Sequence, residues 1–159
     1  MHIEFYEQPH WLVSYLECSR HFVAALPDLI GCGATLYLES YQEREELLPY
    51  LEKHRVPPDA IEPVSTGGSQ RPVWIEHLLL SNDLVSDLES YYSGWYYTLA
   101  DHIHCYRNGQ TLFWFHDAFT GGELQIAAQI PEERVARFCH AVAPTYRQVL
   151  SELKHTATD

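Results

Sequence analysis

The sequence predicts an α+β fold, in which helices pack on one face of a largely antiparallel sheet. Hydrophobic residues make up 46% of the chain and charged residues 20%, which is typical of a folded globular protein. Strand patterns and helix patterns both occur along the chain, and two glycine-containing turns separate three successive strand patterns near its C-terminal end. A length of 159 residues suits one core, so we expect a single globular domain over residues 1–159.

The first half of the chain alternates between strand and helix patterns. Residues 2–6 alternate as a short strand, and Pro9 then opens a helix that Pro27 and the Gly31-Cys32-Gly33 segment close. A strand over residues 34–40 precedes an acidic helix over residues 42–54, where Pro49 indicates a break or a kink. The segment 57–72 is rich in Pro, Gly and Ser, which predicts a short strand near 61–64 followed by an exposed loop.

The second half of the chain contains the clearest pattern, a three-stranded meander. Residues 74–80 fit either a strand or a helix, and a helix follows from a cap at Ser81 or Asn82 to Gly94. We expect meander strands at about 95–107, 110–119 and 123–130, joined by turns at Asn108-Gly109 and Gly121-Gly122. A final helix starts at Pro131 and continues through "PEERVARFCHAVAPTYRQVLSELK".

The turns predict which side chains share a face of the meander. A two-residue turn at Asn108-Gly109 sets His104 opposite Phe113 and Asp101 opposite His116, and a similar Gly-Gly turn sets Phe119 opposite Leu124. Alternation then directs His102 and His104 toward the core with the phenylalanines. The opposite face, which we expect to be the working face, collects Asp101, Ile103, Cys105, Trp114, His116, Gln125 and Gln129.

Two groups of meander residues could carry chemistry. His102 and His104 have the spacing of two metal ligands on one strand, with Asp117, Cys139 or His140 as a possible third ligand for zinc. The alternative, which the predicted packing favours, is a pair of core histidines with hydrogen-bonded ring nitrogens. Asp101 beside His116 could orient the imidazole as a general base, or the two residues could form a cross-strand ion pair that only stabilises the sheet.

The charge balance points to a different class of function. Ten Lys and Arg against 22 Asp and Glu give a net charge of −12, which argues against nucleic-acid binding and favours a basic protein partner. The sequence therefore predicts a small binding module of the inhibitor or immunity type, without a cofactor. Its acidic rim would be Glu43, Glu45, Glu46 and Glu52, and its aromatic anchors would be Trp95, Tyr97 and Trp114.

Further features bear on location and on the alternatives. The N-terminus lacks the basic region of a signal peptide, no apolar run reaches spanning length, and the four cysteines form no C-x-x-C motif. We therefore expect a cytoplasmic protein that does not contact a membrane. A hydrolase that uses the His-Asp pair or a His-rich metal site is the alternative function. A homodimer formed through the Trp-rich sheet face is compatible with either function.

Overall fold

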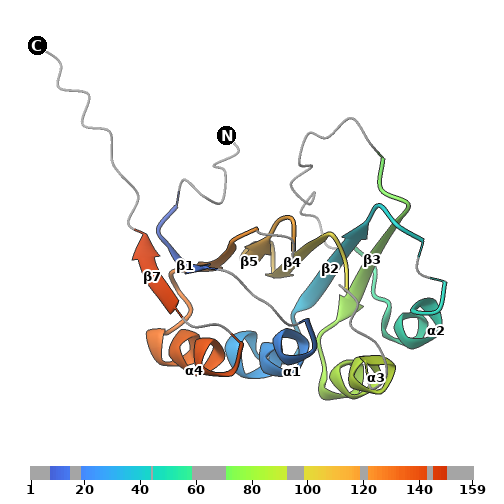
Figure 1. Cartoon of the computed structure of the whole chain (residues 1–159), viewed down its shortest axis with the longest axis horizontal. Helices are drawn as coiled ribbons and strands as arrows, with labels where there is room; N and C mark the ends of the chain where they lie inside the picture. Colours follow the sequence, from blue (N-terminus) through green and yellow to red (C-terminus); the bar gives the residue numbers. More distant parts are fainter. Residues whose placement is uncertain are drawn as a thin grey trace, which may run out of the picture.

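The protein is an α+β structure, as the sequence predicts, in which helices lie along one side of a seven-stranded antiparallel sheet (Figure 1). The computed structural model describes residues 8–14, 19–43, 45–58, 71–92, 99–118, 122–142 and 145–149. Its elements are β1 (His10–Ser14), α1 (Ser19–Ile30), β2 (Thr35–Ser40), α2 (Leu48–Leu51), the 3-10 turn η2 (Glu52–His54), β3 (Trp74–Leu79), α3 (Asn82–Tyr92), β4 (His102–Arg107), β5 (Gln110–Phe115), β6 (Leu124–Ala127), α4 (Glu132–Val142) and β7 (Thr145–Val149).

The strands lie in the order β3-β2-β4-β5-β6-β1-β7, and every strand pair that the structure describes is antiparallel. The neighbours β4, β5 and β6 follow one another along the chain, which confirms the three-stranded meander. β1 fits between β6 and β7, so strands from the two ends of the chain meet at one edge of the sheet. The segment 74–79, which the sequence left open, is the edge strand β3.

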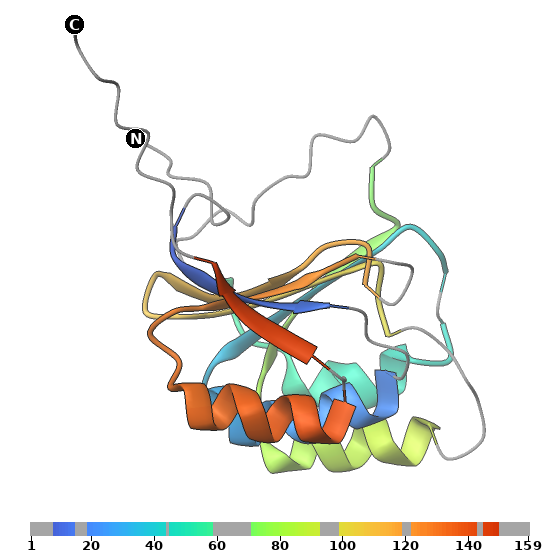
Figure 2. The ribbon, with the colours of Figure 1, turned by 60° about the vertical axis from the view of Figure 1, so that its left-hand side comes forward.

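The core lies between the sheet and the helix layer, which Figure 2 shows as two separate layers. Phe22 of α1 stands at its centre, with its ring 5.8 Å from that of Phe113, 5.5 Å from that of Phe115 and 5.9 Å from that of Phe138. All four rings are at most 1% exposed. Because each buried phenylalanine contributes roughly 1.5–3 kcal/mol to the free energy of unfolding, this group is a major source of stability.

The segment after Pro9 is a strand, and the helix predicted there is wrong. Trp11, Leu12 and Val13 are each at most 7% exposed, because β1 has paired strands on both of its edges. Pairing in the sheet thus overrides the helical spacing of the local sequence. The helix starts at Ser19, includes Pro27, and ends at Ile30, directly before the Gly31-Cys32-Gly33 segment that was predicted to close it. The strand expected at 2–6 lies outside the described residues.

Two other predicted helices are shorter in the structure. The acidic helix expected over 42–54 is reduced to α2 and η2, with Pro49 in the first turn of α2, where a missing N–H costs nothing. The last helix ends at Val142, and β7 replaces its predicted continuation. Proline at 144 explains that end, because proline disfavours the helical conformation of the preceding residue. The strand expected near 61–64 lies outside the described residues.

The turn at Asn108-Gly109 is as predicted, but the register beyond it is not. Asn108 has φ +48° and Gly109 φ +80°, as a type I′ turn requires, and Arg107 pairs with Gln110. A β-bulge follows at Leu112, so Cys105 pairs with Phe113 and His104 with Trp114. This one-residue shift exchanges the two faces of β4.

The exchange overturns the predicted distribution of side chains. Ile103 and Cys105 are fully buried in the core, whereas His102 and His104 share the opposite face with Trp114 and His116. The β5-β6 register also differs, since Leu124 pairs with Phe115 rather than with Phe119. That difference is an even number of residues, so Phe113, Leu124 and Ile126 remain in the core as predicted.

Candidate metal centre

The sheet has a second face that none of the described helices covers, which we call the helix-free face (Figure 1). Imidazole, phenol, indole, carboxylate and amide groups from five adjacent strands and the turn after β5 lie on it. They are Tyr37, Glu39, His77, His102, His104, Tyr106, Trp114, His116 and Gln125. Such a concentration of titratable and hydrogen-bonding groups makes this face the candidate functional surface.

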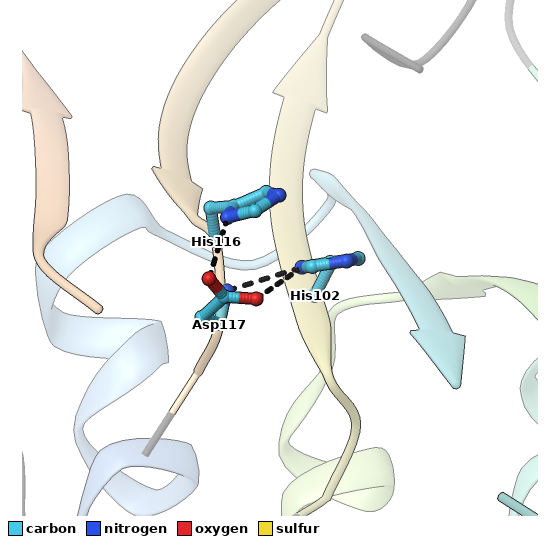
Figure 3. A group of neighbouring side chains, drawn as sticks. All are labelled: His102, His116 and Asp117. Atoms are coloured by element: carbon cyan, nitrogen blue, oxygen red, sulfur yellow. Dashed lines mark hydrogen bonds and ion pairs between the residues drawn. The ribbon is translucent and has the colours of Figure 1, made fainter. Parts of the chain in front are cut away.

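Figure 3 shows a cluster of His102, His116 and Asp117 on this face. His102 comes from β4, and the other two residues come from the turn that follows β5. The Nδ1 atom of His116 lies 3.2 Å from Asp117 Oδ2, and the Nδ1 atom of His102 lies 3.9 Å from Asp117 Oδ1. The two imidazole rings are stacked, with centroids 4.0 Å apart and planes inclined by 19°.

The backbone around Asp117 fixes the cluster. Asp117 has φ +48°, a left-handed conformation that aspartate tolerates better than most residues, and its N–H donates to His102 Nδ1 at 3.1 Å. Gly122 packs directly on this turn, since a Cβ there would lie 1.9 Å from the carbonyl oxygen of His116. Its N–H donates to the carbonyl of Asp117 at 3.2 Å. A side chain at position 122 would therefore displace the turn that carries His116 and Asp117.

The three residues differ in burial. His102 is 3% exposed, whereas the side chains of His116 and Asp117 are 36% and 61% exposed. Burial and the neighbouring His116 lower the pKa of His102, while the carboxylates of Glu39, Asp117 and Asp101 oppose the shift. The buried imidazole is therefore held neutral, which is the form that accepts hydrogen bonds and binds metal ions.

His104 lies on the same face but outside the cluster. Its ring lies 5.2 Å from that of Tyr37 and 5.9 Å from that of Trp114, and it is 5% exposed. Burial, together with the nearby His102 and His116, lowers its pKa to about 3. The structure thus brings together two of the three predicted metal ligands, His102 and Asp117, and adds His116. Cys139 and His140, the other suggested ligands, belong to α4 on the helix side.

A buried carboxylate borders the cluster on β2. Glu39 is 8% exposed and accepts hydrogen bonds from the hydroxyl groups of Tyr37 and, at 2.8 Å, Tyr41. Burial and the Glu39 carboxylate raise the pKa of Tyr37, so this phenol stays a donor. The rings of Tyr41 and His102 form a T-shaped contact, with centroids 5.6 Å apart. The Tyr-x-Glu-x-Tyr spacing of residues 37–41 was the sequence signal for this arrangement.

Asp101 does not form the predicted pair with His116. Its Oδ2 atom accepts hydrogen bonds from Ser40 Oγ at 2.9 Å and from the N–H of Tyr41 at 2.8 Å. The predicted pair required a hairpin without the bulge, and His116 instead lies beside Asp117. Asp101 therefore holds the end of β2 beside the start of β4.

The residues predicted to bind a protein partner fall into three groups. Glu43, Glu45, Glu46 and Glu52 are exposed, although the first three precede α2 rather than lying on a helix. Trp114 is half-buried on the helix-free face. Trp95 and Tyr97 lie outside the described residues.

Comparison with known proteins adds no further residue to this site. None of the described helices has the length and apolar character that a membrane span requires. Comparisons of the chain with protein-family models, with curated proteins and with solved structures find no match.

Proposed function

We propose that the protein binds a divalent transition-metal ion of the zinc type through His102, His116 and Asp117. The observation that carries the proposal is the convergence of one candidate ligand atom from each residue within 4.8 Å of the other two. Two imidazole nitrogens and a carboxylate oxygen form a donor set that suits zinc and related ions, and this set differs from the all-oxygen sets of magnesium and calcium.

The spacing of these atoms is close to what a bound ion needs. Zinc bonds to imidazole and carboxylate are about 2.0–2.2 Å long, so neighbouring ligands in a tetrahedral site lie about 3.4 Å apart. The separations from Asp117 oxygens are 3.2 Å for His116 Nδ1 and 3.9 Å for His102 Nδ1. These separations are to different oxygens of Asp117, and one ligand atom from each residue lies within 4.8 Å of the other two, so the atoms have to close by up to about 1.4 Å to surround one ion.

Metal binding also requires the two imidazole rings to rearrange, which is unfavourable in free energy. The nitrogen lone pairs lie in the ring planes, and the planes of His102 and His116 are nearly parallel, so these lone pairs do not converge on one point. In addition, His102 Nδ1 already accepts a hydrogen bond from the N–H of Asp117. A bound ion therefore has to turn at least one ring and replace that hydrogen bond. We expect this reorganisation to weaken binding into about the micromolar range, near 8 kcal/mol, below the 10–16 kcal/mol of a four-ligand structural zinc site.

Three protein ligands leave at least one coordination position for water or a substrate. A zinc ion in such a site lowers the pKa of its bound water and polarises carbonyl or phosphoryl oxygens. The exposure of His116 and Asp117 makes that position accessible from solvent. This open position supports the metal-site form of the hydrolase hypothesis, with His116 as a ligand where His104 was predicted.

Zinc titration by calorimetry tests the proposal. We expect one Zn²⁺ ion per chain at pH 7.5, with the affinity reduced at least tenfold by His116→Ala or by Asp117→Asn. Asparagine also tolerates the left-handed backbone of residue 117, so the second variant removes the charge and keeps the turn.

A matched control is His140→Ala, which removes an exposed histidine from α4. Its zinc affinity should equal that of the wild type. An equal loss in the control and in His116→Ala, or no zinc binding by the wild-type protein, would contradict the proposal.

Binding of a basic protein remains a second candidate, favoured by the exposure of Glu43, Glu45 and Glu52 near one end of the sheet. Glu46, also exposed, accepts a hydrogen bond from Tyr91 at 3.2 Å. Glutamine at all four positions removes four negative charges without a change in side-chain size. If the acidic segment steers association, this variant should capture a basic partner more slowly and with a weaker salt dependence. Unchanged kinetics would exclude the segment from the interface.

A further inference from the structure

His104 carries a buried polar atom without a partner. Its Nε2 atom has essentially no solvent contact and no hydrogen bond, although the residue is packed between Tyr37 and Trp114. Leaving a buried nitrogen unpaired destabilises a fold, and a phenylalanine of similar shape would fill the position without that cost. The imidazole is therefore unfavourable for folding alone, which suggests a ligand as its missing partner.

The location of His104 connects this nitrogen to the proposed metal centre. His102 and His104 are two residues apart on β4, so their side chains project from the same face about 6.6 Å apart at the backbone. On the neighbouring strand, the Trp114 ring contacts both the ring of His104 and, at 5.8 Å between centroids, the ring of His116. The four side chains thus form one contiguous block on the helix-free face.

We infer that His104 is the fourth protein ligand of the zinc-type ion, so that the occupied centre contains three imidazoles and one carboxylate. This inference rests on the proposed function, because it assigns a ligand to the same ion. Zinc prefers four ligands in a tetrahedron, and the cluster of His102, His116 and Asp117 supplies only three. With His104 bound, the position that the three-ligand centre leaves to water is filled, so water or a substrate reaches the ion only as a fifth ligand. Coordination would give Nε2 the partner that it lacks in the described structure.

The reorganisation that the metal requires is compatible with this role. Turning His102 or His116 out of the stack separates rings whose centroids are 4.0 Å apart. Rotation about the two side-chain torsions of His104 moves its nitrogens by several ångströms, on the order of the spacing between adjacent side chains on a strand. A bound ion would then lie between the two histidines of β4 and the turn after β5.

Ring-nitrogen NMR of the wild-type protein tests the inference without any substitution. Direct coordination shifts the resonance of the bound nitrogen, so titration with Zn²⁺ should move the signals of His102, His104 and His116. The signals of His77, whose Nδ1 lies 2.7 Å from the hydroxyl of Tyr106, serve as an internal control on the same face. They should stay unchanged.

Variants supply the second measurement. His104→Gln should weaken Zn²⁺ binding at least tenfold. In the Co²⁺ complex it should also reduce the intense visible absorption bands that a tetrahedral ion gives. His104→Phe should lose the same affinity while its metal-free form melts at or above the wild-type temperature. The corresponding change His77→Gln should leave affinity and spectrum unaltered.

The outcomes separate this inference from the proposed function. If Zn²⁺ shifts His102 and His116 but not His104, and His104→Gln binds normally, the three-ligand centre stands and the role of His104 is overturned. If Zn²⁺ shifts none of the three histidines, the proposed metal centre fails and the inference fails with it.

Discussion

The two faces of the same sheet are built on different principles. On the helix-covered face, Phe113 and Phe115 pack against Phe22 and Phe138, and these aromatic side chains carry no polar atom to satisfy. On the helix-free face, the alternate residues of the same strands are His102, His104 and Trp114, and the Nε2 atom of His104 has no partner. The first face contributes stability through apolar packing alone, whereas the second carries a buried polar atom that lowers stability.

The largest loss of stability is expected from a substitution on the helix-covered face. Phe113→Ala should lower the free energy of unfolding by about 3–5 kcal/mol, because it removes a fully buried ring from the centre of the core. Trp114→Ala changes the next residue, which is half-buried on the helix-free face, and it should lower the free energy of unfolding clearly less despite the larger ring. Urea denaturation of both variants measures the difference. Equal losses would mean that the two faces contribute similarly to stability.

Acidification should lower the free energy of unfolding through the buried histidines of the helix-free face. The folded-state pKa of His104 is about 3 and its ordinary value is 6.5, so the unfolded chain binds more protons between these limits. The histidine contribution is therefore complete above pH 6.5 and is lost as the pH falls below it, by about 1.4 kcal/mol per pH unit. The lowered pKa values of His77 and His102 act in the same direction.

Urea unfolding between pH 7 and pH 5, with a chelator present, checks this dependence. Replacement of His104 by phenylalanine should reduce the slope of stability against pH. A wild-type stability that is constant over this range would show that the buried histidines titrate normally.

A smaller loss of stability is expected from a substitution at Gly122, which packs on the turn after β5. Gly122→Ala places a methyl group 1.9 Å from the carbonyl oxygen of His116, so the turn that carries His116 and Asp117 has to move. We expect a loss of about 1–3 kcal/mol in stability together with a loss of zinc affinity. Gly33→Ala is a useful comparison, since that glycine has φ +90° but no atom within 4 Å of the added Cβ. It should lower stability through backbone strain alone and leave zinc affinity intact.

Much of the helix-covered face was predictable from the sequence. The alternation of Phe113, Phe115, Leu124 and Ile126 identified core positions, and that assignment survived an error of four residues in the β5-β6 register. Helices with an apolar stripe, such as α4, were also recognised from spacing. These features depend on local periodicity, which a single sequence displays directly.

The helix-free face was not predictable in the same way. One bulge at Leu112 moved His102 and His104 across the sheet, and no residue type marks that position as a bulge. The meeting of Glu39 with His102 depends on β2 pairing with β4, strands separated by more than sixty residues. The strand β1 was read as a helix for a related reason, since its two partners lie near the other end of the chain.

The most direct test of this account is the anomalous diffraction of crystals grown with Zn²⁺ and measured at the zinc absorption edge. We expect one strong peak per chain on the helix-free face, about 2 Å from ring nitrogens of His102 and His116 and from a carboxylate oxygen of Asp117. A map with no peak at this cluster, or with zinc only at exposed residues such as His140, would contradict it.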